Sequence, residues 1–409
     1  MSRVRTALTA ARDEQTRWPA LDGIRGMAIA AVVAYHALKI VGGWTSGKVR
    51  ADGLDWWWWP LGAGRLGVDV FFVLSGFLLW FAWKRLRARH PSGVEALGAY
   101  ARGRAIRILP PYYLMLAVYI PLIAPELLQT TAGLWDTFLF VTVQQYNEPA
   151  LPGRVNVALW TQTVEVQFYV VLPLVVLLIR RLRPLAPLIA ALVLSLWWAD
   201  NRGMYPDSFI VGRLVQFVAG MAVAAAIEPY LDGAKFGLAR ALADRRMAWG
   251  LGALAAVIAL YHGQLLGLPH RGGPDLDRWV HPVLGVLLAA LMAHVVLSPR
   301  HGKVMRAFER PTPRLLGHLS YGVYLWHFPI YDRLLDWTGG AGAGLADGGA
   351  LVGLACATAL TVAASVASYA YLERPLLTRK PRSSVTPEDG SARDGPSPGN
   401  GATPTAGER

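Results

Sequence analysis

Cysteine and charged residues are both scarce in this sequence. Its 409 residues include a single cysteine, Cys356, which excludes a disulfide framework, a thiolate zinc site and an iron–sulfur cluster. Only 16% of the residues are charged, whereas 54% are hydrophobic, and the mean hydropathy is +0.34. This composition is far too apolar for an ordinary soluble domain. The sequence therefore predicts an integral membrane protein.

Common nucleotide and metal motifs are missing as well. The chain has no Walker A pattern, no GxGxxG segment after a strand and no HExxH segment. Nucleotide hydrolysis, dinucleotide binding and zinc proteolysis therefore have no support, and we expect no metal ion.

Long hydrophobic runs, in contrast, recur along the whole chain. Each is roughly 17 to 25 residues long, which is enough to cross a bilayer as a helix. Ten such runs predict an all-α, polytopic helical bundle, at about 21–41, 67–83, 108–124, 160–179, 184–199, 209–227, 247–261, 281–297, 315–335 and 350–372. A further run at 134–146 is short and contains Asp136, Gln144 and Gln145, so we expect an interfacial or re-entrant segment there.

The basic residues predict which ends of the runs face the cytoplasm. With ten spans and the N-terminus inside, the inner segments carry 29 of the 40 Lys and Arg residues and the outer loops carry 7. This matches the positive-inside rule and places both termini in the cytoplasm. The net charge of +13 is then explained by topology, and no nucleic-acid partner is expected.

The same pattern divides the chain into three parts. Residues 1–17 are predicted to be a cytoplasmic N-terminal arm, and residues 18–380 the transmembrane domain. Residues 381–409 are rich in Pro, Gly, Ser and Thr and are predicted to be a disordered cytoplasmic tail.

Ionisable side chains inside the runs are candidate functional groups, because each costs a few kcal/mol at the bilayer centre. Arg25 and His36 are eleven residues apart, which places them on one helix face but about 16 Å apart in depth. Arg25 should lie near the inner side and His36 in the outer half. The alternative is that both residues are structural. Arg25 would then extend its charged end to the membrane surface, and His36 would hydrogen-bond to a neighbouring helix.

Three more ionisable groups are predicted to reach the depth of His36. Glu165 lies near the outer start of the fourth run, Asp69 near the outer start of the second, and His327 in the outer half of the ninth. A carboxylate at that level could orient the His36 imidazole as a proton acceptor. Each group alone also has a structural explanation, as a helix cap, an interhelical donor or an interfacial residue. The candidate substrate contacts from the second and ninth runs are Asp69, Ser75, Tyr324 and His327.

A pair of arginines marks the inner end of the third run. Arg104 and Arg107 are three residues apart, so both face the same side of a helix and could clamp phosphate groups from the cytosol. The alternative is a simple positive-inside anchor, which we favour for the Lys84 to Arg89 segment.

Six sequence blocks resemble, in the same order, those of the acyltransferase family 3 membrane proteins. They are LDGIRGMAIAAVVAYH with Arg25 and His36, GVDVFFVLSGFLL, RAIRILPPYY, LWTQTVEVQFYVVLP, LSYGVYLWHFP and YLERPL. The similarity covers roughly residues 18 to 380. Thr161 and Gln162 stand where the family often has Ser-Leu, and a Trp precedes His327.

The resemblance implies a ten-helix enzyme in a bacterial cytoplasmic membrane that moves an acyl group, often acetyl, from acyl-CoA to a hydroxyl group. The implied acceptor is a carbohydrate (a glycan or glycolipid) or a polyketide such as a macrolide, with membrane lipid as the surroundings. Carried over residue by residue, the resemblance makes Arg25 and His36 the essential pair of the first span. It also points to Arg104 and Arg107 as the Arg-x-x-Arg pair and to Glu165 as the fourth-span glutamate.

We therefore expect acyl-CoA to dock at the inner face with its phosphates on Arg104 and Arg107. His36 would activate the acceptor hydroxyl or carry the acyl group, with Glu165 orienting the imidazole. One rival is a proton-coupled transporter or flippase that uses the same His and Glu as a proton relay, although no inverted repeat is found. Another is the membrane-bound O-acyltransferase family, which shares the chemistry but not these blocks.

Overall fold

The computed structural model describes most of the chain. The described residues are 2–13, 17–42, 62–123, 156–201, 209–233, 241–267, 274–298, 302–344 and 347–378. Met1–Leu377 forms one compact unit, and Thr378–Arg409 forms a second, of which only Thr378 is described. The predicted re-entrant segment at 134–146 and the predicted disordered tail at 381–409 both lie outside the described residues. The three predicted parts of the chain therefore stay predictions.

The described residues are helical and contain no strand, which confirms the predicted all-α class. In the first half, the helices are α1 (Ser2–Asp13), α2 (Pro19–Val41), η1 (Ala63–Leu66), α4 (Gly67–Arg89), α5 (Gly93–Ile123), η3 (Val157–Leu159), α7 (Trp160–Leu182) and α8 (Leu185–Asn201). In the second half, they are α9 (Ile210–Leu231), α11 (Arg245–Gly267), α12 (Pro274–Leu297), α13 (Lys303–Phe308), α14 (Pro311–Trp337), α15 (Gly348–Ser368), η5 (Tyr369–Glu373) and α16 (Arg374–Thr378).

Each of the ten predicted hydrophobic runs falls within or overlaps one of these helices. Seven helical segments of the described chain are long and apolar enough to cross a membrane, and they include α2, α4, α5, α7, α9, α12 and α15. Helix α8 is apolar but shorter, while α11 and α14 are not among the seven. Helix α14 carries several polar side chains that face the protein interior, which lowers its hydropathy. The chain is thus a multi-pass membrane protein, and the number ten remains a prediction.

Local sequence explains how several helices begin and end. Pro19 and Pro311 stand at the starts of α2 and α14, where a missing backbone N–H costs nothing. At the start of α15 the Asp347 carboxylate accepts a hydrogen bond from the backbone N–H of Ala350. The end of α15 widens into one π-helical turn, Tyr369–Glu373, which overlaps the start of the YLERPL block.

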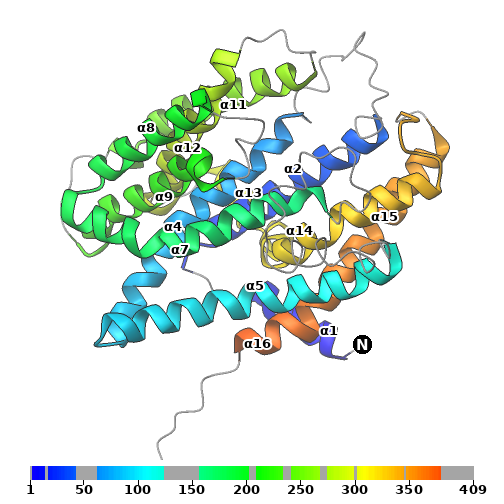
Figure 1. Ribbon diagram of the computed structural model, residues 1–409, viewed down its shortest axis with the longest axis horizontal. Coiled ribbons are helices and arrows are strands. Elements are labelled where there is room, and N and C mark those ends of the chain that lie inside the picture. Colours follow the sequence, from blue (N-terminus) through cyan, green and yellow to red (C-terminus); the bar gives the residue numbers. More distant parts are fainter. Residues whose placement is uncertain are drawn as a thin grey trace, which may run out of the picture. The chain divides into compact units, whose positions relative to one another are not determined.

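Glycines allow several pairs of helices to pack with their backbones in contact. A Cβ atom at Gly26 of α2 would collide with the carbonyl of Pro313 on α14, and one at Gly317 with the carbonyl of Asp22. Gly76 and Gly220 play the same part between α4 and α9. Small residues permit this close approach in membrane helices. Figure 1 shows α2 and α14 near one another in the middle of the bundle.

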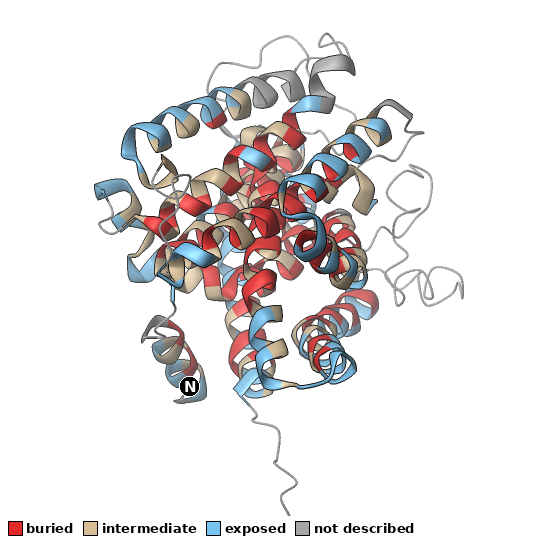
Figure 2. Cartoon of the chain, turned by 90° about the vertical axis from the view of Figure 1, so that its left-hand side faces the viewer, coloured by how far each residue is buried: buried red, intermediate tan, exposed pale blue. Residues whose placement is uncertain are grey.

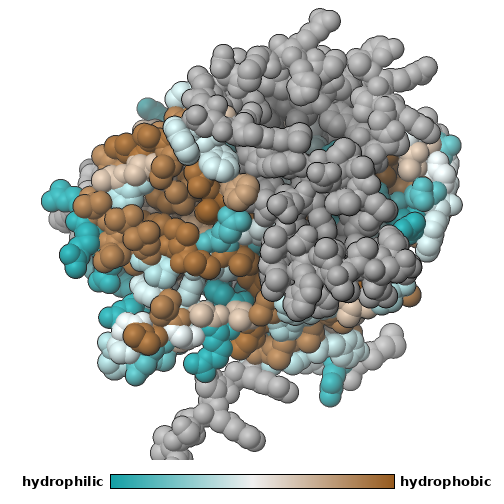
Figure 3. All heavy atoms as spheres, viewed as in Figure 1, coloured by the Kyte–Doolittle hydropathy of each residue, from teal (hydrophilic) through white to brown (hydrophobic). Residues whose placement is uncertain are grey.

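Buried residues lie along the centre of the helix packing, and apolar side chains also cover the outside. Figure 2 shows the buried positions concentrated where the helices face one another. Figure 3 shows a broad apolar area on the described surface, with hydrophilic residues toward its edges. Exposed apolar side chains on α7 and α8 include Val170, Leu174, Ile189, Val193 and Trp197. Such a surface suits contact with lipid.

Candidate active site

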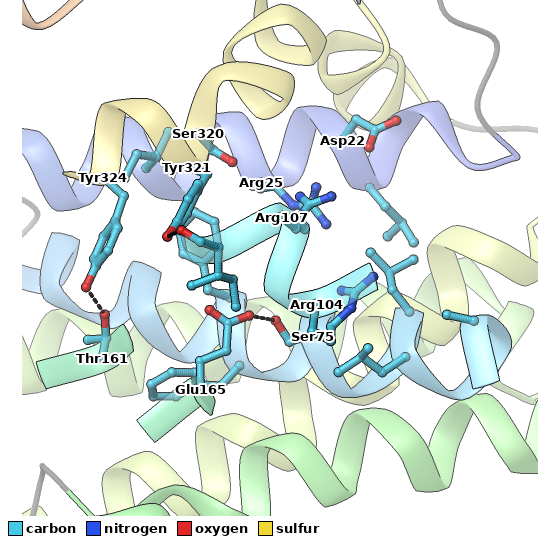
Figure 4. A pocket seen from close by; sticks show the side chains of 18 of the residues that line it. Asp22, Arg25, Ser75, Arg104, Arg107, Thr161, Glu165, Ser320, Tyr321 and Tyr324 are labelled. Atoms are coloured by element: carbon cyan, nitrogen blue, oxygen red, sulfur yellow. Dashed lines mark hydrogen bonds between the residues drawn. The ribbon is translucent and has the colours of Figure 1, made fainter. Parts of the chain in front are cut away.

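A cavity of about 360 Å³ lies among α2, α4, α5, α7 and α14. Its walls combine apolar side chains with a small set of convergent polar groups, the usual composition of a ligand pocket. Figure 4 shows the arginines at one side of the cavity and Tyr324 and Thr161 at the other. Most of the site residues predicted from sequence line this space: Arg25, Ser75, Arg104, Arg107, Glu165 and Tyr324.

Three guanidinium groups converge on the cavity. Arg25 comes from α2, while Arg104 and Arg107 lie three residues apart on α5, as the spacing predicted. The side chains of Arg25 and Arg107 are close enough to interact electrostatically and are drawn next to each other in Figure 4. Cations held together without an equal number of acids favour an anionic ligand.

Two more arginines belong to the same cavity. Arg17 and Arg85 line it and are exposed to solvent. The Arg17 guanidinium lies 4.6 Å from the centre of the Trp18 ring, so the aromatic face also takes part in this end of the cavity. The sequence reasoning treated Arg85 as an anchor and Arg17 as part of the arm, because neither lies inside a hydrophobic run.

Glu165 is held by neighbours on the cavity wall. Its carboxylate accepts hydrogen bonds from Ser75 Oγ at 3.2 Å and from the Tyr169 hydroxyl. The sequence reasoning missed Tyr169, although its position four residues after Glu165 puts both on one helix face. The expected contact between Glu165 and His36 is not present among the described residues. Glu165 bonds to Ser75 and Tyr169, whereas His36 contacts a different residue, described next.

The partner of His36 is His327. His36 Nδ1 lies 3.0 Å from His327 Nε2, and the two ring centres are 5.1 Å apart. Neither histidine lines the cavity, but Val32 does, and His36 follows it by one helical turn, a rise of about 6 Å. The histidine pair therefore lies directly beyond the end of the cavity.

Tyr324 links the cavity to the histidine pair. Its phenol lines the cavity, donating a hydrogen bond to the backbone carbonyl of Ala158 at 2.6 Å and accepting one from Thr161 Oγ1 at 2.9 Å. Its own backbone carbonyl accepts a hydrogen bond from His327 Nδ1 at 2.8 Å. One residue thus contacts both the cavity and the histidine pair.

Asp69, the remaining predicted substrate contact, lies outside the cavity. It is 1% exposed and faces α9 and α12. Its carboxylate accepts a hydrogen bond from Gln216 Nε2 at 2.9 Å and lies 3.1 Å from His281 Nδ1 and 3.4 Å from Arg213 Nη1. The prediction from depth alone missed this buried charged cluster, because it did not count Arg213, Gln216 and His281 as one group.

Comparisons with known proteins identify the family of the chain. A family model described as an acyltransferase domain matches residues 18–370, most of the chain. The chain belongs to acyltransferase family 3. The protein is therefore a membrane acyltransferase, and the transporter and the unrelated O-acyltransferase family of the sequence analysis are set aside. The match includes the helices that carry Arg25, Arg104, Glu165 and His327.

The names of individual relatives refer to exopolysaccharide production and to O-acetyl transfer. The chain is 32% identical over 325 residues to the exopolysaccharide production protein ExoZ of Rhizobium meliloti, covering 77% of this chain and 90% of ExoZ. It is 25% identical to the peptidoglycan O-acetyltransferase OatA of Listeria monocytogenes and 24% identical to O-acetyltransferase OatA of Staphylococcus aureus, over 76% of this chain in both cases. The chain spans about half the length of these OatA proteins. No solved structure gave a significant match.

Proposed function

We propose that this acyltransferase moves an acetyl or similar acyl group from cytosolic acyl-CoA to a hydroxyl group of a surface carbohydrate. The observation that carries the proposal is a cavity in which Arg25, Arg104 and Arg107 meet Glu165. The same cavity is lined by Val32, one helical turn before His36. An arginine-lined cavity suits a phosphorylated donor, because guanidinium groups bind phosphate in a bidentate manner. With both termini in the cytoplasm, the arginines lie at the inner side of the membrane, where acyl-CoA is found.

The donor is proposed to lie with its phosphates on Arg104 and Arg107 and its thioester toward Tyr324 and Thr161. In this pose only the Tyr324 side chain lies between the acyl carbon and His36. The Tyr324 side chain is then the group that has to move for the thioester to reach the imidazole. Glu165 lies among the arginines and the pocket hydroxyls, so its role is to order the cavity rather than to hold His36.

The acceptor is proposed to reach His36 from the outer half of the membrane. His36 is partly exposed, and its ring does not face the cavity lining. A carbohydrate acceptor is favoured over a polyketide by the names of the relatives, which refer to exopolysaccharide and peptidoglycan. His36 accepts the proton of the acceptor hydroxyl while the hydroxyl oxygen attacks the thioester carbon.

Transfer of labelled acetyl groups from acetyl-CoA to isolated envelope polysaccharide, with the protein in nanodiscs, tests the proposal. We expect His36→Ala to lower the rate by about 100-fold or more, the scale of losing a general base. Full activity in this variant would remove His36 from the chemistry.

Donor binding is tested separately by calorimetry with acetyl-CoA and no acceptor. We expect Arg104→Gln with Arg107→Gln to weaken binding at least about tenfold, since charge-assisted bonds to phosphate are lost. Arg102→Gln is the matched control, because Arg102 lies on the same helix but is exposed and does not line the cavity. Equal weakening by the control would show that only general positive charge matters.

A further inference from the structure

His327 is completely buried yet carries two sets of polar contacts. Its exposed fraction is 0%, so in this structure it is shielded from any substrate by His36 and Tyr324. The sequence suggested a substrate contact, and the structure places His327 behind His36 instead. A buried imidazole that pairs with a catalytic candidate calls for an explanation of what it does there.

The two ring nitrogens of His327 have different partners. Nδ1 lies 2.8 Å from the backbone carbonyl oxygen of Tyr324 and 3.1 Å from that of Val323. Carbonyl oxygens only accept hydrogen bonds, so Nδ1 must carry a hydrogen. Among the described residues no carboxylate bonds to His327, and a buried cation without a counter-charge is costly. In the neutral ring, Nε2 is therefore the acceptor.

This assignment determines the protonation of His36. The distance of 3.0 Å joins His327 Nε2 to His36 Nδ1, so His36 Nδ1 must be the donor. The neutral His36 ring then has no hydrogen on Nε2. The rings of Phe328 and Tyr35 restrict how this imidazole can turn, because their centres lie 5.4 Å and 5.2 Å from its own, the first nearly perpendicular to it and the second tilted.

We propose that His327 is a positioning residue that holds His36 in its Nδ1–H tautomer, so that Nε2 is the atom that accepts the acceptor's proton. This inference rests on the proposed function of His36 as the base. The arrangement resembles the role of the aspartate in a Ser-His-Asp triad, with a neutral imidazole in place of the carboxylate.

The chemical step balances with these groups alone. The acceptor hydroxyl gives its proton to His36 Nε2, and its oxygen forms a bond to the thioester carbon. The C–S bond breaks, and the proton on His36 passes to the departing thiolate to give free CoA thiol. While His36 is cationic, its Nδ1–H points at the lone pair of His327 Nε2, which stabilises the positive charge.

Two amide substitutions separate the contacts of His327. In His327→Gln the amide oxygen can reach the position of Nε2 and accept the His36 hydrogen bond. In His327→Asn the amide nitrogen can reach the position of Nδ1 and donate to the Tyr324 carbonyl, but the contact with His36 is lost. We expect kcat to fall about 100-fold or more in H327N and to stay within about tenfold of the wild type in H327Q, with the donor KM little changed in both.

The tautomer can be read without any turnover. Nitrogen-15 NMR of histidine-labelled protein in nanodiscs distinguishes a protonated from an unprotonated ring nitrogen, and His36→Gln identifies the His36 signals among the nine histidines. We expect the Nδ1–H form in the wild type and in H327Q, and the Nε2–H form or a mixture in H327N.

The outcomes distinguish this inference from the proposed function. An Nε2–H tautomer of His36 in the wild type, or a tautomer unaffected by H327N, would overturn the positioning role. Higher activity in H327N than in H327Q would also overturn it, because that order indicates a purely structural hydrogen bond to the backbone. If the tautomer follows the prediction but His36→Ala stays active, the positioning geometry is supported and the proposed base is wrong.

Discussion

Two polar clusters inside this membrane protein use similar side chains in opposite ways. Around Asp69 the charges bond to one another, and Asp69, Arg213 and Gln216 are all at most 2% exposed. Around Glu165 the arginines and the carboxylate surround about 360 Å³ of space. Ionisable groups in a hydrophobic run are therefore no sufficient mark of a substrate site. A cavity next to such groups distinguishes a candidate binding site from a cluster that only holds helices together.

We call the group around Asp69 the closed cluster and the group around Glu165 the open cluster. The largest effect of a substitution is expected for the closed cluster. Asp69→Asn removes the negative charge that faces Arg213 and His281, and breaking a buried ion pair costs about 3 kcal/mol or more. We expect a matching drop in the free energy of unfolding, measured by chemical denaturation in detergent, with unchanged turnover per folded molecule. A specific loss of turnover in a stable D69N protein would restore Asp69 as a substrate contact.

Glu165→Gln in the open cluster should show the reverse pattern. In the proposed function its carboxylate orders the cavity, so we expect the rate of acyl transfer to fall on the order of 100-fold, which corresponds to about 2.7 kcal/mol of barrier. The thermal unfolding midpoint should change little, since the carboxyl group lies beside open space. A large loss of stability with normal turnover would show that Glu165, like Asp69, serves the fold, and the proposed difference between the two clusters would be wrong.

Arg107→Gln is expected to affect binding more than chemistry. Losing one of the proposed phosphate contacts should raise the donor KM about tenfold and make the donor KM less sensitive to salt, while kcat changes less. Steady-state kinetics at two ionic strengths measure both effects. A fall in kcat with an unchanged KM would place Arg107 at the reacting atoms instead.

Ser75→Ala should have the smallest effect. It removes one of the hydrogen bonds to Glu165, a net contribution of about 1 kcal/mol, and so we expect a several-fold lower rate. Activity equal to that of E165Q would show that Ser75 acts on the substrate directly.

The sequence predicted which residues belong to the open cluster better than it predicted their contacts. The helix class, the Arg104–Arg107 face and the presence of Arg25 and Glu165 in one site follow from hydrophobic runs, spacing and motif blocks. The contacts do not, because the position of a residue along a span gives its depth but not the direction in which it points. Asp69, Glu165 and His36 lie at comparable predicted depth, yet each bonds to a different helix.

The pairing of helices was also hidden in the sequence. Arg213 lies near the start of the run 209–227 and His281 begins the run 281–297, and nothing in one sequence indicates that α4, α9 and α12 are neighbours. The cavity end at Tyr324 depends likewise on how α14 packs against α2 and η3. The i,i+4 relation of Glu165 and Tyr169 was the one local signal that could have been used.

The glycine contacts between α2 and α14 have a consequence for turnover. Where main chain touches main chain, no side chain can rotate to make room, and these helices should behave as one stiff unit. His36 and His327 then keep a fixed separation through the catalytic cycle. Gly67 of α4 also lies against the α2 backbone, so an opening for the proposed carbohydrate acceptor must arise elsewhere, by displacement of α5 or α7 relative to this unit.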